Sequence, residues 1–224
     1  RFLAVLIITF FGLSVPAHAD FIISSAIIEF KADSPPQSDI ELISRSQDKE
    51  YVATEIAEIL NPGQPNETRQ IITDPTKGRL LVTPDKAVLG GGSRKVMRFV
   101  LLKPPEDKEH IYRIAVKPVI KGVDQEAKVD LKILVGYEVL VIVRPAVIQS
   151  SYQAQRSGKT LTVTNNGNTN ILFQNGKQCE ASENCKLPPV LRVYPGQTAS
   201  AEMPYDSPVT YSIWDGQDNV EKTY

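Results

Sequence analysis

The segment from Val129 to Arg144, VDLKILVGYEVLVIVR, constrains the fold of this chain more than any other. Every odd-numbered position from 129 to 143 is apolar, which is the period of two that a β-strand requires. Such a strand would extend for about 50 Å, since each residue adds about 3.3 Å, whereas an ordinary strand has roughly five or six residues. The even-numbered positions of its first part include Asp130, Lys132, Gly136 and Glu138. The apolar side chains therefore need a partner, which is either another part of this chain or a different chain.

Short alternating runs recur through the rest of the chain, with Gly, Pro and Asn between them. This spacing predicts an all-β protein built from antiparallel sandwiches. The run 51–60, YVATEIAEIL, has the Ala and Glu content of a helix, but Asn61-Pro62-Gly63 ends it as a turn would, so we expect a strand. The sequence Asn165-Asn166-Gly167-Asn168 predicts a hairpin. Pro145 cannot donate a backbone hydrogen bond and should end the long strand, which predicts two domains, 20–144 and 145–224.

The start of the chain has the features of an export signal. Residues 1–19, RFLAVLIITFFGLSVPAHA, combine a positive residue, an apolar core and the small-residue site Ala17-His18-Ala19. This is the pattern of a secretory signal peptide, and the apolar run is too short to span a bilayer. We expect the mature chain to begin near Asp20 in an exported compartment.

Cys179 and Cys185 are the two cysteines of the chain and stand close together in KQCEASENCKL. In an exported chain this spacing predicts a disulfide that closes a small loop. A metal site is the alternative, but His110 is the one histidine of the expected mature chain, and two sulfur ligands would need further partners. We expect the disulfide and no metal.

Charge and motifs exclude several classes of function. The formal net charge of −1 provides no electrostatic basis for binding nucleic acid or an anionic membrane. A hydrolase would need a nucleophile beside His110, yet no G-x-S-x-G or reactive-cysteine motif is present. We interpret His110 as a solvated residue at a strand edge, and the acidic loop before it, with Glu106, as solvated too. The glycine-rich LGGGS lacks the lysine and helix of a phosphate loop, so we expect neither catalysis nor a cofactor.

Several motifs then occur in a characteristic order. After the signal peptide come Leu81-Val82-Thr83-Pro84 with a Gly-rich turn, Val96-Met97-Arg98-Phe99, Ile111-Tyr112-Arg113-Ile114, the long alternating strand and Arg144-Pro145-Ala146. This order resembles the periplasmic pilus chaperones of the chaperone-usher pathway. Asn61-Pro62-Gly63, the Tyr112-Arg113 pair and the cysteine pair resemble the alternate branch, which assembles fimbriae of the colonisation-factor and common-pilus kind.

The resemblance implies two immunoglobulin-like domains set at an angle in a boomerang shape. A pilin would bind in the cleft and along the last strand of the first domain, by donor-strand complementation. The side chains that would enter the groove of the fimbrial subunit are Val129, Leu131, Ile133, Val135 and Tyr137. The later residues Leu140, Val141 and Val143 would belong increasingly to the core of the chaperone itself, and Gly136 is a candidate site for a change of parity.

One departure from the family concerns charge in the cleft. The best-known branch holds the C-terminal carboxylate of the subunit with an arginine and a lysine, where this chain has Ile27 and Leu140. The nearby cations that could replace them are Arg113, Lys117 and Arg144. The interdomain ion network of the family corresponds to Arg98, Glu109 and Asp215, which would orient the two domains.

The resemblance therefore implies a non-enzymatic periplasmic chaperone. It would bind pilins and the tip adhesin, complete their fold with its own strand, and pass them to an outer-membrane usher. The same exposed strand predicts that the free chaperone could associate with itself. The alternative is a secreted two-domain β-sandwich with a structural or adhesive role in a fimbria.

Overall fold

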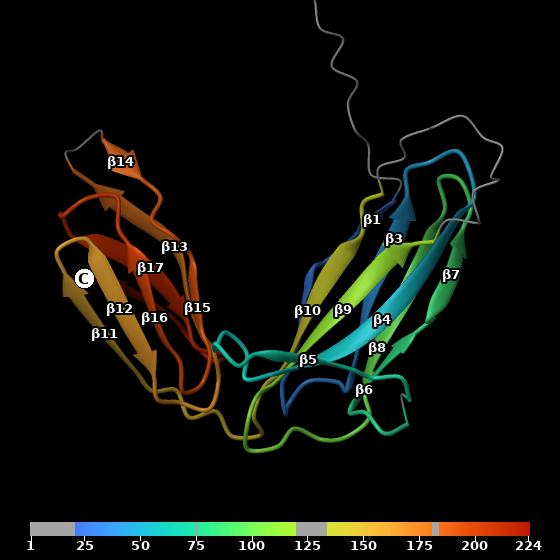
Figure 1. The fold of residues 1–224 in the computed structure, drawn as a ribbon, viewed down its shortest axis with the longest axis horizontal. Helices are drawn as coiled ribbons and strands as arrows, with labels where there is room; N and C mark the ends of the chain where they lie inside the picture. The colour runs from blue at the N-terminus through green and yellow to red at the C-terminus, as the bar shows by residue number, and fades with distance from the viewer. Residues whose placement is uncertain (1–20, 75, 120–133, 181–183) are drawn as a thin grey trace, which may run out of the picture.

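The computed structural model describes residues 21–74, 76–119, 134–180 and 184–224. Within these ranges the regular structure consists of strands alone, so no described helix could cross a membrane. The strands form two immunoglobulin-like β-sandwiches arranged as the arms of a boomerang (Figure 1). The predicted all-β fold with two sandwiches is thus confirmed, whereas the expected signal peptide, residues 1–19, lies outside the described residues.

The first sandwich is built from ten strands in two sheets. They are β1 (Phe21–Ile23), β2 (Ile27–Phe30), β3 (Gln37–Ser44), β4 (Glu50–Leu60), β5 (Thr68–Ile71), β6 (Leu80–Thr83), β7 (Lys86–Leu89), β8 (Arg94–Leu101), β9 (His110–Pro118) and β10 (Tyr137–Val143). One sheet has the order β1-β3-β8-β6, and the other has the order β2-β10-β9-β4-β5 with β7 paired to β4. The segment 51–60 is a strand, as expected, because it lies inside β4 between β9 and its hairpin partner β5.

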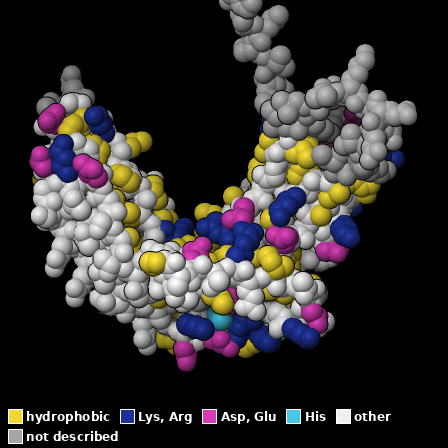
Figure 2. Space-filling view, in the orientation of Figure 1, with side chains coloured by type: hydrophobic (Ala, Val, Ile, Leu, Met, Phe, Trp, Pro, Cys, Tyr) yellow, Lys and Arg dark blue, Asp and Glu magenta, His cyan; other side chains and the backbone are white. Residues whose placement is uncertain are grey.

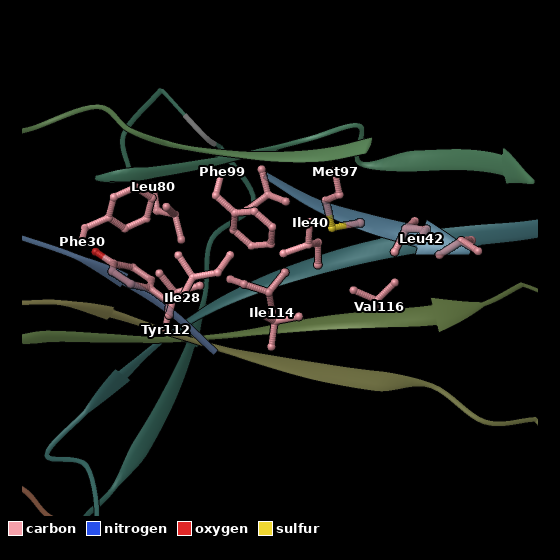
Figure 3. Packing of buried hydrophobic residues seen from close by; sticks show 14 of the residues in the cluster. Ile28, Phe30, Ile40, Leu42, Leu80, Met97, Phe99, Tyr112, Ile114 and Val116 are labelled. Atoms are coloured by element: carbon pink, nitrogen blue, oxygen red, sulfur yellow. The ribbon is translucent and has the colours of Figure 1, made fainter. Parts of the chain in front are cut away.

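The core of the first sandwich is formed by the inward side chains of both sheets. Met97 and Phe99 of β8 face Ile114 and Val116 of β9, and all four are fully buried (Figure 3). Alternation along each strand is what produces this face, because successive side chains point to opposite sides of a sheet.

The second sandwich follows in sequence with eight strands. They are β11 (Tyr152–Ser157), β12 (Thr160–Asn165), β13 (Ile171–Cys179), β14 (Cys185–Lys186), β15 (Leu191–Val193), β16 (Thr198–Glu202), β17 (Val209–Trp214) and β18 (Asn219–Thr223). The sheets have the orders β11-β12-β16 and β14-β13-β17-β18, with β15 paired to β13. Phe173 lies at the centre of the core, edge-on to Tyr152 and Tyr211, each with ring centroids 5.6 Å away.

The hairpin predicted at Asn165–Asn168 is wrong, because β12 and β13 belong to different sheets. The Asn165 side chain is fully buried and donates hydrogen bonds to the carbonyl oxygens of Thr169 and Val193, both at 2.8 Å. Its amide oxygen accepts a bond from the Gly167 backbone at 2.9 Å. This asparagine satisfies the backbone where the chain crosses between sheets, and so no hairpin ladder is needed there.

Candidate functional site

The last strand of the first sandwich, β10, has one edge that is only partly paired. It pairs with β9 along its whole length, but with β2 only from Leu140 to Val143. Among the described strands, none pairs with the other edge of β10 from Tyr137 to Val139. Val135 lies just before this edge and is 42% exposed. Of the predicted donor residues, Val129, Leu131 and Ile133 lie outside the described residues.

The structure corrects one residue of the predicted donor set. Tyr137 is half-buried against the core of the first sandwich, with its ring 5.3 Å from that of Phe21. Val139, Val141 and Val143 continue inward on the same parity and are fully buried. Tyr137 therefore belongs to the chain's own core and is not available to enter another protein.

The opposite parity of β10 faces the concave side between the two arms. Leu140 pairs in register with Ile27 on one side and with Arg113 on the other. Leu140 is buried in a small cluster with Ile142 and with Tyr194 of the second sandwich, whereas Ile27 is half exposed. The two apolar residues that replace the family's cationic pair are thus neighbours, and Arg113 is the cation next to them.

Arg113 shares its carboxylate partner with a second arginine. The guanidinium of Arg69 on β5 lies 2.8 Å from Glu138 on β10, and that of Arg113 lies 3.5 Å from the same carboxylate. Arg69 reaches across β4 and β9 to make this contact. Lys117 is paired with Glu55 at 3.2 Å and is more than half exposed. Figure 2 shows basic and acidic side chains gathered along this part of the concave side.

Arg144, the third predicted cleft cation, is buried and fully engaged. Its side chain has no exposed surface and lies 2.8 Å from the carboxylate of Glu29 and 3.1 Å from that of Glu109. It also donates to the hydroxyl of Thr169 at 2.7 Å and to the carbonyl of Asn170 at 3.3 Å, both in the second sandwich. Arg144 is therefore an interdomain hub, and the prediction that it offers a free charge to a ligand is wrong.

Glu109 completes this hub from the first sandwich. One of its carboxylate oxygens accepts hydrogen bonds from Arg144, from the Thr169 hydroxyl at 2.7 Å, and from the backbone and side-chain nitrogens of Asn170 at 3.1 and 2.8 Å. Arg192 of β15 donates to the side-chain oxygen of Asn170 at 2.5 Å, and burial lowers the pKa of its guanidinium. The hub thus joins the two sandwiches through charge-assisted hydrogen bonds.

The predicted network of Arg98, Glu109 and Asp215 is wrong in two of its three members. Arg98 lies on the first sheet, where it binds Asp39 through two hydrogen bonds of 2.8 and 2.7 Å. Asp215 accepts bonds from the backbone nitrogens of Gln217 and Asp218, within its own turn. The neighbouring Gly216 packs against the Arg144 guanidinium, where an added Cβ would lie 3.2 Å from a nitrogen. Arg144 adjoins Pro145 at the linker, and that position was the sequence signal for the hub.

His110 is also not solvated as expected. It begins β9 with a side chain only 10% exposed, and its two ring nitrogens lie 2.8 Å from Glu58 and 3.1 Å from Glu106. Glu106 in turn pairs with Arg79. The partners of His110 are thus carboxylates that tie the loop before β9 to the sandwich, and this arrangement is structural.

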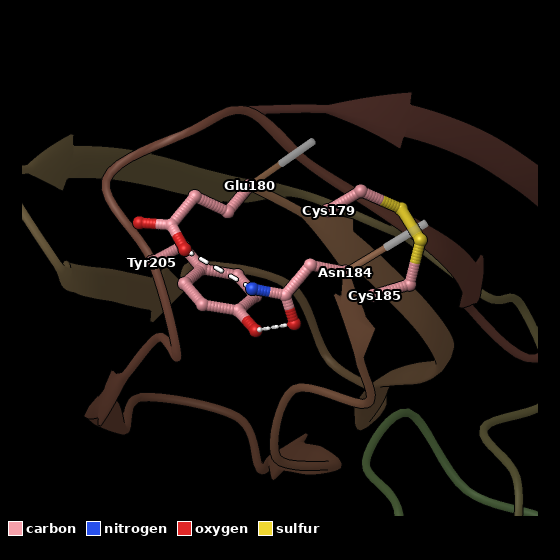
Figure 4. The surroundings of a disulfide bond; sticks show 5 residues. All are labelled: Cys179, Glu180, Asn184, Cys185 and Tyr205. Carbon is pink, nitrogen blue, oxygen red and sulfur yellow. Dashed lines mark hydrogen bonds between the residues drawn. A yellow bond between two sulfur atoms is a disulfide. The ribbon is translucent and has the colours of Figure 1, made fainter. Parts of the chain in front are cut away.

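The predicted disulfide between Cys179 and Cys185 is confirmed. It joins the end of β13 to β14, where the two cysteines are direct register partners. Figure 4 shows Asn184 beside it, with its amide bonded to Glu180 and to the hydroxyl of Tyr205. Two kinds of crosslink therefore fasten this hairpin to the second sandwich.

Comparison with known proteins identifies the family. Residues 20–149 match the family described as pili and flagellar-assembly chaperone, PapD N-terminal domain. A CS1 fimbrial protein of Escherichia coli is 30% identical over 185 residues, which cover 80% of this chain and 74% of that protein.

Solved structures show the same fold across both arms. The class 5 fimbriae chaperone CfaA matches 91% of this chain and 98% of its own, with 22% identity and a TM-score of 0.61. A chain from the complex of Salmonella enterica SafA pilin with the SafB chaperone matches 94% of this chain and 98% of its own, with 13% identity and a TM-score of 0.63. Together with the partly unpaired β10 and the charged concave face, these matches lead to one conclusion: the chain belongs to the pili and flagellar-assembly chaperones that carry a PapD N-terminal domain.

Proposed function

We propose that this chain is a non-enzymatic periplasmic chaperone that binds fimbrial subunits and the tip adhesin by donor-strand complementation, and delivers them to an outer-membrane usher. The observation that carries this proposal is the edge of β10 from Tyr137 to Val139, which has no described strand beside it. Unpaired backbone groups on such an edge can hydrogen-bond a strand of another protein. The family match supports the chaperone role over that of a structural fimbrial component.

The donor residues in this proposal are Val129, Leu131, Ile133 and Val135. They share one parity of the alternating sequence and precede the part of β10 that is buried in the first sandwich. Val135 supports the assignment because its apolar side chain is substantially exposed in the free chain. An exposed apolar row beside an unpaired edge suits a subunit whose own fold lacks a strand.

The first prediction concerns Val135→Asp, tested beside Val96→Asp as a matched control. Val96 is a similarly exposed valine on β8 of the other sheet. In a complex, Asp at 135 would bury an unpaired carboxylate and cost about 3 kcal/mol or more of binding free energy. The free protein should change by less than about 0.5 kcal/mol, because the site is on its surface.

Both variants would be co-expressed with a pilin, and the yield of the copurified complex would be compared with thermal unfolding of the free chaperone. Loss of capture in Val135→Asp alone, with folding retained, supports donation. A Val135→Asp protein that captures pilin as well as Val96→Asp does would refute it.

We further propose that Arg113, with Lys117 as a secondary site, supplies the anion-binding charge of the cleft. Arg113 lies beside Leu140 and Ile27, which replace the cationic pair of the best-known branch. Glu138 pairs with both Arg113 and Arg69 in the free chain, so the two guanidiniums together carry one more positive charge than this carboxylate neutralises. A subunit carboxylate could bind that excess charge.

The second prediction is that Arg113→Gln weakens pilin binding about tenfold, corresponding to about 1.4 kcal/mol. Arg94→Gln is the control, since Arg94 is also an exposed arginine paired with a glutamate, Glu41, but on the other sheet. Affinity for a purified pilin would be measured at low and high salt, because screening should reduce the contribution of an exposed charge. Equal affinity and equal salt dependence in the two variants would exclude Arg113 as the anchor.

A further inference from the structure

The turn between β4 and β5 contacts the second sandwich at a place separate from the arginine hub. The backbone oxygen of Gly63 in this turn accepts a hydrogen bond of 2.5 Å from the side-chain nitrogen of Gln197. Gln197 lies in the turn between β15 and β16. Figure 1 shows the β4–β5 hairpin reaching toward β15 on the concave side, above the linker that joins the two arms.

The contact is oriented at both ends of the Gln197 amide. Its oxygen accepts a bond from the Tyr194 backbone at 3.0 Å, which leaves the nitrogen to face Gly63. Gly63 has φ of 72°, and an added Cβ would lie 2.7–2.9 Å from the Gln197 amide atoms. The Gly63 nitrogen is itself held by the Glu67 carboxylate at 2.6 Å. A side chain at position 63 is excluded by both the backbone conformation and the neighbour.

An open space separates this contact from the hub. A pocket of about 550 Å³ lies there, and its lining includes Leu60, Pro62, Glu109 and Pro195. The two arms are therefore joined at two points with a gap between them. One point beside a linker permits rotation about that point, whereas a second point on the concave side opposes opening of the angle.

The same hairpin leads directly into β5, which carries Arg69. Arg69 binds Glu138, the carboxylate that also holds Arg113. A displacement of the hairpin would thus move one of the two guanidiniums that face the cleft.

From these contacts we propose that Gln197 and Gly63 form an interdomain brace, and that Gln197 is a positioning residue for the partner bound in the cleft. The brace holds the angle between the arms and keeps Arg69 in place on the concave face. The positioning part of this inference rests on the proposed function, whereas the effect on the angle does not.

The test uses Gln197→Glu, which keeps the size of the side chain and the acceptor for Tyr194 but replaces the donor that faces Gly63 with an oxygen. Gln155→Glu is the matched control, because Gln155 is exposed on β11 of the same sandwich. Gly63→Ala attacks the same contact from the other arm. Spin labels attached after Val96→Cys and Val220→Cys, two exposed positions on different arms, report the interdomain distance in the absence of pilin.

We expect both brace variants to fold, with a distance distribution that is broader and shifted to longer values than in the wild type and in Gln155→Glu. Capture of pilin should fall severalfold in the same two variants. An unchanged distribution in both would overturn the brace. Unfolding of either variant would also contradict it, because the contact is claimed to orient the arms and not to hold either of them folded.

The two proposals can fail separately. A changed distribution with wild-type capture would refute the positioning role while the brace stands. If the wild type itself captures no pilin, the proposed function fails, and the distance distribution still decides whether Gln197 fixes the angle.

Discussion

Two arginines show how differently one residue type can act within this chain. Arg144 is fully buried between the carboxylates of Glu29 and Glu109, whereas Arg98 pairs with Asp39 on an exposed face. A buried charge is stable only while its partners remain, because each partner has lost its contact with water. An exposed pair is screened by solvent and contributes little to stability.

We therefore predict that Arg144→Ala lowers the free energy of unfolding by about 3–5 kcal/mol, since it leaves two carboxylates without their cation. Arg98→Ala should cause no measurable loss. Denaturation by urea, followed by circular dichroism, would compare the two variants. Equal losses would show that the buried hub has no special role in stability.

At the scale of single elements, the β13–β14 hairpin is held by side chains as well as by its ladder. The disulfide closes the hairpin, and Gly176 allows close packing beneath Pro188, because an added Cβ would lie 2.8 Å from the Tyr211 ring. Tyr211 donates a hydrogen bond to the Pro189 carbonyl at 2.8 Å, and burial raises the pKa of its hydroxyl to about 12. The segment after β14 is thus fixed at several places.

Removing the disulfide by Cys179→Ser with Cys185→Ser should lower stability by about 2–3 kcal/mol, as expected for a short closed loop. The loss should fall on the second sandwich, with pilin capture largely retained, because the donor edge lies in the other arm. Thiol titration of the denatured, unreduced wild type should detect no free cysteine. Two free thiols, or a double variant as stable as the wild type, would contradict this assignment.

At the scale of the whole molecule, the two arms share an apolar contact in addition to the hub and the brace. Tyr194 of the second sandwich is buried against Ile59, Ile111, Leu140 and Ile142, which lie on the outer face of the first. This contact explains why β10 is buried on both faces near its end, unlike an ordinary sandwich strand. Burial of this kind couples the stabilities of the two arms.

Tyr194→Ala should cost about 2–3 kcal/mol, because it uncovers apolar side chains on both arms. Scanning calorimetry should then resolve separate transitions for the two sandwiches. Leu187→Ala is the control, since Leu187 is 84% exposed and should leave the wild-type profile unchanged. A single unaltered transition in Tyr194→Ala would show that the arms are coupled without this contact.

Local patterns in the amino-acid sequence were enough to predict which segments are strands and which cysteines pair. Alternation in β4 and β10 and the spacing of Cys179 and Cys185 are local properties, and local properties survive in the fold. The order of short motifs also identified the chaperone family, which the family match confirms.

Which of those side chains meet could be learned only from the folded chain. Alternation places Tyr137 and Val135 on one parity, but it does not say that Tyr137 is already covered by Phe21 while Val135 is exposed. Likewise, the partner of a charged residue depends on which strands become neighbours, so Arg98 pairs with Asp39 and Arg144 with Glu109. Periodicity specifies the face of a strand, whereas burial and pairing depend on residues far away in sequence that the fold brings alongside it.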